Sequence, residues 1–342
     1  MKKALAFILA LAMMLSLVAC GSGGSDETPS GTDGEKKAWN IAVVPKEVTA
    51  EWFQRLEVGV NDFKAANPDL TVTYKGPDTT DAALQYAVVE DLIASGVDAI
   101  CVVPIDPASL DTLFAQAREQ GIVVITHEGS ADGNVDYDVA AFDNTAYGEF
   151  MMQCLAEQMN YEGKYVTMVG SLTNASHMEW AKAGIAYQQA NYPDMQVIEE
   201  DQFVEMNDDV DECMNKIKEL IKKYPDLKGI YGTSGHVAPT AAQLFTEMDL
   251  IGKMFAVGVS QPNRSREYVE NGALKYAICW DPAAAAYAMC QAAVTILDGG
   301  QITDGCDLVA DGYTAVTVAG KQITGTGWIT ESKDENLGKY DF

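Results

Sequence analysis

The chain has 342 residues, a length that predicts two domains of ordinary size. It carries 23 Lys and Arg against 50 Asp and Glu, a net charge of −27. This charge excludes nucleic acid as a partner, because no basic surface could neutralise phosphates, and it disfavours adsorption to anionic lipid. An acidic protein at the cell exterior is the expectation.

The first 37 residues are predicted to lie outside the fold. Lys2 and Lys3 precede an apolar run over residues 4–19, which ends in small residues directly before Cys20. A short membrane span is the alternative, but the Gly/Ser-rich stretch after Cys20 favours a bacterial lipoprotein signal, residues 1–20, with Cys20 as the lipidated N-terminus. Residues 21–37 then form a flexible tether of about 20 to 25 Å root-mean-square reach. We expect a protein anchored by lipid alone to the extracytoplasmic face of the cell membrane.

Further cysteines occur at positions spread along the chain: Cys101, Cys154, Cys213, Cys279, Cys290 and Cys306. Export permits disulfides, but several of these residues lie in apolar or helical patterns, so small buried thiols are favoured over a disulfide framework. Cys290 with Cys306 is the pair that could form a bridge. No CxxC spacing occurs, so a zinc cage is not supported.

The stretch from Ile41 to Val60 introduces the pattern that the rest of the chain repeats. Residues 41–44 form an apolar run, typical of a strand buried on both faces of a parallel sheet. The apolar spacing that begins at Phe53 predicts an amphipathic helix. Lys46, Trp52 and Phe53 therefore lie near the carboxyl end of the strand, where open parallel sheets bind ligands. The turn has no glycine-rich phosphate cradle, and a lysine beside two aromatics suits a small sugar.

Strands and helices alternate strictly after this unit. The first half is predicted to continue as strand 70–74, helix 81–95, strand 98–103, helix 106–121 and strand 122–126. Leu84, Val88 and Leu92 are expected to form the buried face of the second helix. The second half is predicted as helix 145–159, strand 164–170, helix 176–190, strand 196–200, helix 209–223, strand 229–232, helix 239–248 and strand 255–259.

The two halves are predicted to share one design. A strand, a helix, a proline stop and a second strand recur at nearly the same interval, from Ile41 to Asn67 and from Tyr165 to Tyr192. The alternative is that x-P-D is only a common helix exit, since it recurs at residues 224–227 within one half. The tail adds strand 274–279, helix 282–297 and strands 313–318 and 322–329, and residues 334–342 are expected to pack across a lobe. The fold class is α/β, with two Rossmann-like lobes built on parallel sheets.

A ligand cleft is expected where the strand ends of the two lobes face each other. Polar and aromatic side chains occupy those positions: Lys46, Trp52, Phe53, Asp106, His127, Glu128, Ser176, His177, His236, Pro239, Ser260, Gln261, Trp280 and Asp281. Aromatic rings cover the apolar C–H face of a sugar, while carboxylates and amides accept its hydroxyl hydrogens.

Some of these residues have a second interpretation. The three histidines with Glu128 could hold a metal, although no HxH or HExxH spacing is present, and otherwise they are hydrogen-bonding groups or unrelated loop residues. Asp106 and Asp281 each precede a proline, so each could serve only as a helix cap. Catalysis is the minor hypothesis, since nucleophile-elbow, G-x-G-x-x-G and P-loop motifs are all missing from the sequence.

Several local motifs together resemble a known family over residues 40–342. They are VVPKEV with WF, YKGPDTTD, VDAICVVPIDP, GIVVITHE, APTAAQ, AVGVSQPN, ICWD and ENLGKYDF. The chain resembles the sugar-binding type I periplasmic binding proteins, most closely the subgroup that serves autoinducer-2 and rhamnose importers. The resemblance implies lobes joined by a three-strand hinge, with crossings near Phe142-Asp143, near Asp281 and after the helix that begins at Pro282. The lobes would comprise residues 38–143 plus 282–310 and residues 144–281 plus 311–342.

The resemblance also implies site roles. Lys46 would donate to a ligand hydroxyl, Glu128 stands where the autoinducer-2 binders have Asp, and Pro239, Ala241 and Asp281 would contact the ligand. Two positions depart from the family pattern. An Asp-Gln pair of the autoinducer-2 binders is Ser176-His177 here, and an arginine of the ribose binders is Gly129, so ribose is not the expected ligand.

The function predicted from the sequence is a monomeric, extracytoplasmic lipoprotein that captures a small sugar-like molecule by lobe closure and delivers it to the membrane permease of an ABC importer. It would need no cofactor and no metal. The alternatives are a ligand sensor for a membrane receptor and, less favoured, a metal-binding protein or enzyme that uses the histidines.

Overall fold

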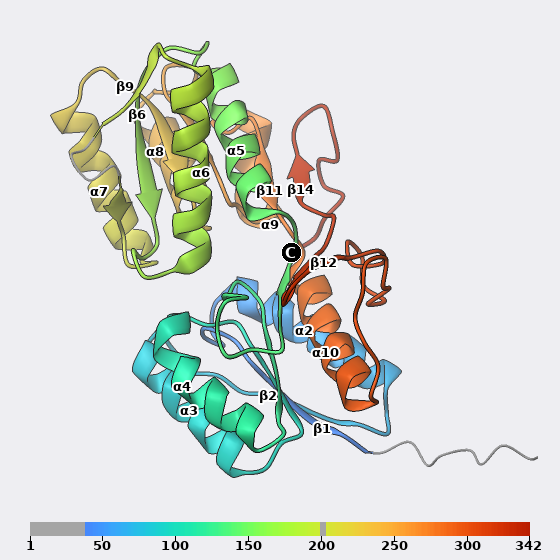
Figure 1. Ribbon diagram of the computed structural model, residues 1–342. Coiled ribbons are helices and arrows are strands. Elements are labelled where there is room, and N and C mark those ends of the chain that lie inside the picture. Colours follow the sequence, from blue (N-terminus) through green and yellow to red (C-terminus); the bar gives the residue numbers. More distant parts are fainter. Residues whose placement is uncertain (1–37, 199–202) are drawn as a thin grey trace, which may run out of the picture. The chain divides into compact units, whose positions relative to one another are not determined.

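The computed structural model of the chain (Figure 1) describes residues 38–198 and 203–342. The expected signal peptide, its Cys20 and the tether lie outside the described residues. No helix within the described ranges is long and apolar enough to cross a membrane.

The first lobe is built on a seven-stranded sheet in the order β12-β13-β5-β4-β3-β1-β2. All neighbours are parallel except β12 and β13. The strands are β1 (Asn40–Val44), β2 (Thr71–Tyr74), β3 (Ala99–Val102), β4 (Val123–Thr126), β5 (Tyr137–Ala140), β12 (Thr317–Ala319) and β13 (Gln322–Thr324). The helices are α2 (Glu51–Ala66), α3 (Ala82–Ala94), α4 (Pro107–Glu119) and α10 (Pro282–Leu297).

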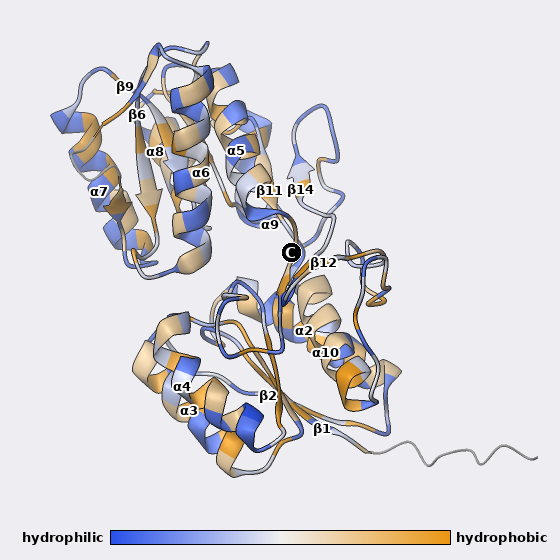
Figure 2. Ribbon diagram, viewed as in Figure 1, coloured by the Kyte–Doolittle hydropathy of each residue, from blue (hydrophilic) through white to orange (hydrophobic). Residues whose placement is uncertain are grey.

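Both faces of this sheet are covered, as the apolar run of β1 predicts. Ile41 and Val43 belong to the hydrophobic cluster that includes the buried faces of α2 and α10, whereas Ala42 and Val44 belong to the cluster with α3 and α4. Figure 1 shows these two helix pairs on opposite sides of the sheet, and Figure 2 shows the hydrophobic colouring concentrated on the strands between them. Strand residues of this kind alternate between the two faces, so a continuous apolar run is needed where both are covered.

Helices α2 and α10 approach each other closely at one glycine. A Cβ placed on Gly59 would lie 2.0 Å from the carbonyl oxygen of Ala283. Any side chain there would push α10 away from α2. Because α10 begins at the hinge, Gly59 fixes the position of the hinge against the first lobe.

The second lobe is built on a five-stranded parallel sheet in the order β10-β9-β6-β7, with β8 also paired to β6. Its strands are β6 (Gly163–Val169), β7 (Met195–Val197), β8 (Val204–Glu205), β9 (Leu227–Gly232) and β10 (Phe255–Gly258). Its helices are α5 (Asn144–Gln158), α6 (Ala175–Asn191), α7 (Val210–Lys223), α8 (Val237–Glu247) and α9 (Pro262–Asn271). Strand β11 (Ala277–Cys279) pairs antiparallel with β14 (Ile329–Glu331) and makes a bridge to Val259, just after β10.

Three chain segments join the lobes: residues 141–143, 280–281 and 325–328. The expected boundary near the end of the chain needs a correction. Residues 311–342 were assigned to the second lobe, but β13 pairs in parallel with β5, with Ile323 opposite Val139, and so extends the first sheet. Burial of Ile323 in the core of the first lobe explains this placement. The chain reaches the second lobe only at β14.

The buried face of α3 was also predicted wrongly, by one residue. Leu84 is 50% exposed, whereas Gln85 is 1% exposed. The Gln85 amide donates to the carbonyls of Pro45 and Val103, each at 2.9 Å, and accepts from the backbone N–H of Ile105 at 2.9 Å. A polar residue therefore satisfies backbone groups where β1 and β3 end, which apolar periodicity could not indicate.

Three elements were missed altogether: β5, the two-residue strand β8 and helix α9. Strand β5 carries a buried Asp138 among apolar residues, which breaks the apolar pattern by which the other strands were recognised.

The described cysteines are all free thiols, so Cys290 forms no bridge with Cys306. The thiol of Cys290 is instead hydrogen-bonded to Cys101, and that contact, with burial, raises the pKa of Cys101. Small buried thiols were the favoured interpretation, and of the six only Cys306 is not fully buried.

Candidate functional site

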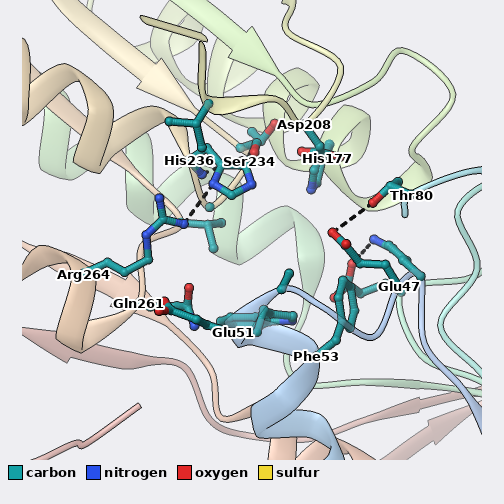
Figure 3. A pocket seen from close by; sticks show the side chains of 18 of the residues that line it. Glu47, Glu51, Phe53, Thr80, His177, Asp208, Ser234, His236, Gln261 and Arg264 are labelled. Atoms are coloured by element: carbon teal, nitrogen blue, oxygen red, sulfur yellow. Dashed lines mark hydrogen bonds and ion pairs between the residues drawn. The ribbon is translucent and has the colours of Figure 1, made fainter. Parts of the chain in front are cut away.

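A cavity of about 420 Å³ contains residues of both lobes and of the hinge (Figure 3). The first lobe contributes the turn after β1 and the start of α2, and the second lobe contributes α6 and the loops that follow β8, β9 and β10. The lining residues are Lys46, Glu47, Thr49, Ala50, Glu51, Trp52, Phe53, Thr80, Glu128, His177, Trp180, Asp208, Val210, Thr233, Ser234, Gly235, His236, Val259, Gln261, Arg264 and Trp280.

A buried ion pair forms one part of the lining. Lys46 Nζ lies 2.7 Å from Glu128 Oε2, and both side chains are 8% exposed. Burial alone would raise the pKa of Glu128, but the charge and hydrogen bond of Lys46, together with smaller contributions from His127 and His177, outweigh burial and lower that pKa below its ordinary value. Glu128 is therefore ionised at neutral pH. The amine of Lys46 has further N–H donors for a ligand.

The turn that carries Glu128 is held by the strand that sequence analysis missed. Glu128 has a φ of 57°, in the left-handed region that is uncommon for residues other than glycine. Asp138 of β5 accepts from the backbone N–H of Gly129 at 2.9 Å and from the hydroxyl of Thr126 at 2.7 Å. These bonds hold the chain on both sides of Glu128 and keep its carboxylate beside Lys46.

His127 is buried and does not line the cavity. Its Nδ1 lies 2.6 Å from the carbonyl oxygen of Val139, and its Nε2 accepts from the indole N–H of Trp280 at 3.1 Å. Since an indole N–H can only donate, the ring proton is assigned to Nδ1 and the imidazole is neutral. Both nitrogens are used within the protein, so His127 is available neither to a metal nor to a ligand.

His177 does line the cavity, from the first turn of α6. Asn174 caps that helix by accepting from the backbone N–H of His177 at 3.2 Å. The His177 residue is 8% exposed, and its Nδ1 has no hydrogen-bond partner. Burial lowers its pKa, so the imidazole is neutral at neutral pH. Its Nδ1 can therefore form a hydrogen bond with a ligand.

His236 lies on the same wall, at the start of α8. Arg264 Nη1 lies 2.9 Å from His236 Nδ1. A guanidinium only donates, so Nδ1 accepts and the ring is neutral. Burial, and then the charge of Arg264, lowers the pKa of His236. No group of three His, Cys, Asp or Glu residues in the described ranges is arranged to hold a metal ion.

Aromatic rings form the apolar part of the lining. The Trp52 and Trp280 rings meet edge to face, with centroids 4.7 Å apart and an interplanar angle of 77°. Trp180 packs against Trp280 at 5.5 Å. Phe53 borders the cavity and also belongs to the core under α2. Both aromatics predicted beside the first strand therefore reach the cavity.

The structure brings eight of the predicted site residues into the lining: Lys46, Trp52, Phe53, Glu128, His177, His236, Gln261 and Trp280. The others lie outside it. His127 and Ser176 stand behind Glu128, and the Ser176 hydroxyl donates to Glu128 Oε2 at 3.4 Å. Ser260 is buried between Gly258 and Ile278, and Pro239 and Ala241 are buried within α8.

Asp106 and Asp281, for which helix capping was the second interpretation, both act as helix caps. Asp106 accepts from the backbone N–H of Ala108 at 3.1 Å at the start of α4. Asp281 accepts from the N–H of Ala283 at 2.9 Å at the start of α10, and it pairs with Arg55 at 2.6 Å. Neither residue lines the cavity.

Several lining residues were missed by sequence analysis, above all Asp208 and Arg264. Asp208 follows the two-residue strand β8, and Arg264 lies on α9, so both belong to unpredicted elements. The one available signal was the run Asn207-Asp208-Asp209 at the start of the helix predicted over residues 209–223. Trp180 on α6 carried no such signal, since a tryptophan at helical spacing is predicted to be a core residue.

Comparisons with known proteins agree with this architecture. The family described as "Periplasmic binding protein domain" matches residues 41–301. A xylitol-binding protein of Mycolicibacterium smegmatis is 28% identical over 247 residues, which are 70% of this chain and 65% of that protein. The matched region thus spans slightly less than two thirds of that relative.

Two solved structures share the fold. LsrB from Clostridium saccharobutylicum, in complex with AI-2, has a TM-score of 0.80 and 19% identity, and covers 89% of this chain and 100% of its own. A solute-binding protein of an ABC transporter from Clostridium phytofermentas, with bound L-rhamnose, has a TM-score of 0.77 and 18% identity, and covers 89% of this chain and 98% of its own. The family match, together with two α/β lobes around a cavity at the strand ends, shows that the chain belongs to the periplasmic binding protein family, in its type I fold.

Proposed function

We propose that the chain captures a small sugar or sugar-like molecule in the cavity between its lobes and delivers it to the permease of an ABC importer. The observation that carries the proposal is the combination of four aromatic side chains with buried, charged hydrogen-bonding groups around about 420 Å³. Rings of this kind cover the C–H face of a sugar, and paired charges exchange hydrogen bonds with its hydroxyls. The volume is within the range of small-ligand sites.

Rhamnose-like and autoinducer-2-like molecules are the proposed ligand class. Two features support it. The fold is shared with proteins whose structures contain AI-2 and L-rhamnose, and Lys46 and Glu128, for which the resemblance implies roles at the ligand site, line the cavity. His177, which stands where the autoinducer-2 binders present an amide, also lines the cavity. A neutral imidazole can donate one hydrogen bond and accept another, as an amide can.

The test is a thermal-shift screen followed by calorimetry on the exported protein without its signal. Rhamnose, fucose, arabinose, xylitol, ribose and autoinducer-2 would be added singly, because a ligand that binds only the folded state raises stability by RT ln(1 + [L]/Kd). At least one should raise Tm and bind with one-to-one stoichiometry, and EDTA should leave that shift unchanged. If no sugar, polyol or autoinducer-2 binds, sugar capture is wrong.

A sensor that presents its closed state to a membrane receptor is the second candidate, since it would use the same fold. Uptake separates the two functions: deletion of the gene should abolish import of the identified ligand if the chain serves a permease, and should leave import intact if it serves a receptor.

We also propose that the protein is a monomer held to the outer face of the cell membrane through Cys20. The apolar run before Cys20 and the Gly/Ser-rich stretch after it support the anchor. Light scattering of the soluble domain would measure its mass directly, and a dimer mass would contradict the monomer.

A further inference from the structure

The Asp208 wall is the side of the cavity formed by His177, Asp208 and Thr233 of the second lobe. It carries a carboxylate without a counter-charge. Asp208 forms no ion pair with a Lys, Arg or His among residues 38–198 and 203–342. Burial would by itself raise its pKa, but His177 in its protonated form, the charge of Lys46 and a hydrogen bond from Ser234 outweigh burial, so the pKa is lowered. Asp208 is therefore ionised at neutral pH, while Lys46 is already bonded to Glu128.

The backbone places this carboxylate at the cavity. Asp208 has a φ of 50°, in the left-handed region. Its carboxylate packs against Gly170 at the end of β6, where a Cβ would lie 2.1 Å from Asp208 Oδ1. The missing side chain at Gly170 leaves the space that the Asp208 carboxylate fills, so its position is built into the fold.

Two buried polar atoms of the same wall also have no partner. They are Nδ1 of His177 and Oγ1 of Thr233, and both residues line the cavity. Figure 3 shows His177 and Asp208 on the opposite side of the cavity from Glu51 and Phe53. A carboxylate oxygen, an imidazole nitrogen and a hydroxyl oxygen can all accept a hydrogen bond. The wall therefore offers three acceptors to whatever enters.

The net charge of the whole lining also favours a positively charged ligand. Glu47, Glu51, Glu128 and Asp208 supply four carboxylates, against Lys46 and Arg264, which leaves a net charge of −2 when the histidines are neutral. This net charge disfavours a ligand with a carboxylate or phosphate. A cation would be attracted both by the carboxylates and by the faces of the tryptophans.

We propose that the Asp208 wall binds a protonated amine, so that the captured molecule is an amino sugar or an amino polyol. This inference rests on the proposed sugar capture and names the class of sugar. An ammonium group has three donors and no acceptor, which matches the acceptors of Asp208, His177 and Thr233. A ligand hydroxyl would leave the Asp208 charge uncompensated when the lobes close, at a cost that an ammonium avoids by forming a charge-assisted hydrogen bond.

The test compares matched sugars on the unmodified protein by calorimetry at neutral pH. In each of the gluco, galacto and manno series, the 2-amino sugar would be set against the neutral parent, the N-acetylated amino sugar and the uronate. In at least one series the amino sugar should bind roughly tenfold or more tightly than its parent, and acetylation should remove the gain because it removes the charge.

Other outcomes separate this inference from sugar capture itself. If neutral sugars bind and no amino sugar binds more tightly than its parent, the amine subsite is wrong and sugar capture stands. If neither these series nor the wider screen of sugars and polyols gives any binding, both are wrong. Tight binding of a uronate would also contradict the amine subsite.

A variant tests the residue assigned. Asp208→Asn keeps the shape and tolerates the left-handed backbone, and it should remove the preference for the amino sugar over its parent. Asp211→Asn is the matched control, because Asp211 is an exposed aspartate on α7 outside the cavity; it should keep the full preference. If Asp208→Asn folds and retains the preference, Asp208 is not the amine site. The sugar series on the unmodified protein decides the matter if the variant does not fold.

Discussion

The indole N–H of Trp280 donates to Nε2 of His127 across 3.1 Å. Trp280 lies in the second chain crossing between the lobes, and His127 directly follows the carboxyl end of β4 in the first sheet. The bond therefore ties the hinge to the turn that carries Glu128. All the atoms involved are buried, so loss of the donor would leave an imidazole nitrogen unpaired.

Trp280→Phe should lower the free energy of unfolding by about 1 to 3 kcal/mol, the usual cost of an unsatisfied buried acceptor. Urea unfolding monitored by circular dichroism would measure it. Trp39→Phe is the matched control, because the Trp39 indole donates to Asp298 at an exposed site, where the loss should be a few tenths of a kcal/mol. Equal losses in the two variants would contradict the role given to the His127 bond.

Lys46→Met should destabilise the protein by about 3 to 5 kcal/mol at neutral pH, because it leaves the buried Glu128 charge unpaired. The double variant Lys46→Met/Glu128→Gln should recover most of this loss, since no charge then remains. Chemical unfolding of the three proteins gives the comparison. If the double variant is no more stable than Lys46→Met, an unpaired charge is not the cause.

The same ion pair predicts opposite responses to acid. In the unmodified protein the Glu128 pKa is lowered below its ordinary value of 4.5, so its contribution to stability is complete above that pH and is lost as pH falls through the folded-state pKa. In Lys46→Met, the charge that lowers this pKa most is lost, so the Glu128 pKa should rise, and protonation on acidification should remove the unpaired buried charge. The difference in unfolding free energy between the two proteins should therefore narrow as pH falls. A difference that stays constant would contradict this assignment.

Two histidines predict a second, milder pH dependence. The pKa values of His177 and His236 are both lowered from 6.5, in each case chiefly by burial. The unfolded chain then takes up protons before the folded one, so stability should begin to fall as pH drops below about 6.5. His177→Gln should make the unfolding free energy less dependent on pH between about pH 7 and pH 5. An unchanged slope would mean that His177 is not buried in solution.

Cys20→Ser should release the protein from the membrane, because the thiol is the predicted point of acylation. Fractionation of cells that produce either form gives the measurement, with detergent phase partitioning as a second readout. Cys306→Ser, a half-buried thiol in the first lobe, is the control and should stay with the membrane. A Cys20→Ser protein that still partitions with membranes would rule out the lipid anchor.

Much of the site was predictable because it follows directly from strands that the sequence marks clearly. Lys46, Trp52 and Phe53 come just after β1, and Glu128 comes just after β4, so a buried apolar run fixed their place at the sheet edge. His127 is the neighbour of Glu128 in the sequence, but its side chain points the opposite way, into the protein, where it contacts Val139 and Trp280. Sequence position alone cannot distinguish two neighbours that point to opposite sides of one strand end.

The sequence by itself determined the α/β class and the two lobes, because apolar runs, helical periods of 3.6 residues and the order of elements are local properties of the chain. The family was indicated by the resemblance of short motifs over residues 40–342. Only the tertiary structure decided that β13 joins the first sheet, that Gln85 replaces Leu84 on the buried face of α3, and that Asp208 stands in the cavity. Each of these depends on a partner distant in sequence: β5, the carbonyls of Pro45 and Val103, and Gly170. Whether a polar side chain is buried and paired depends on such long-range contacts, which no local pattern encodes.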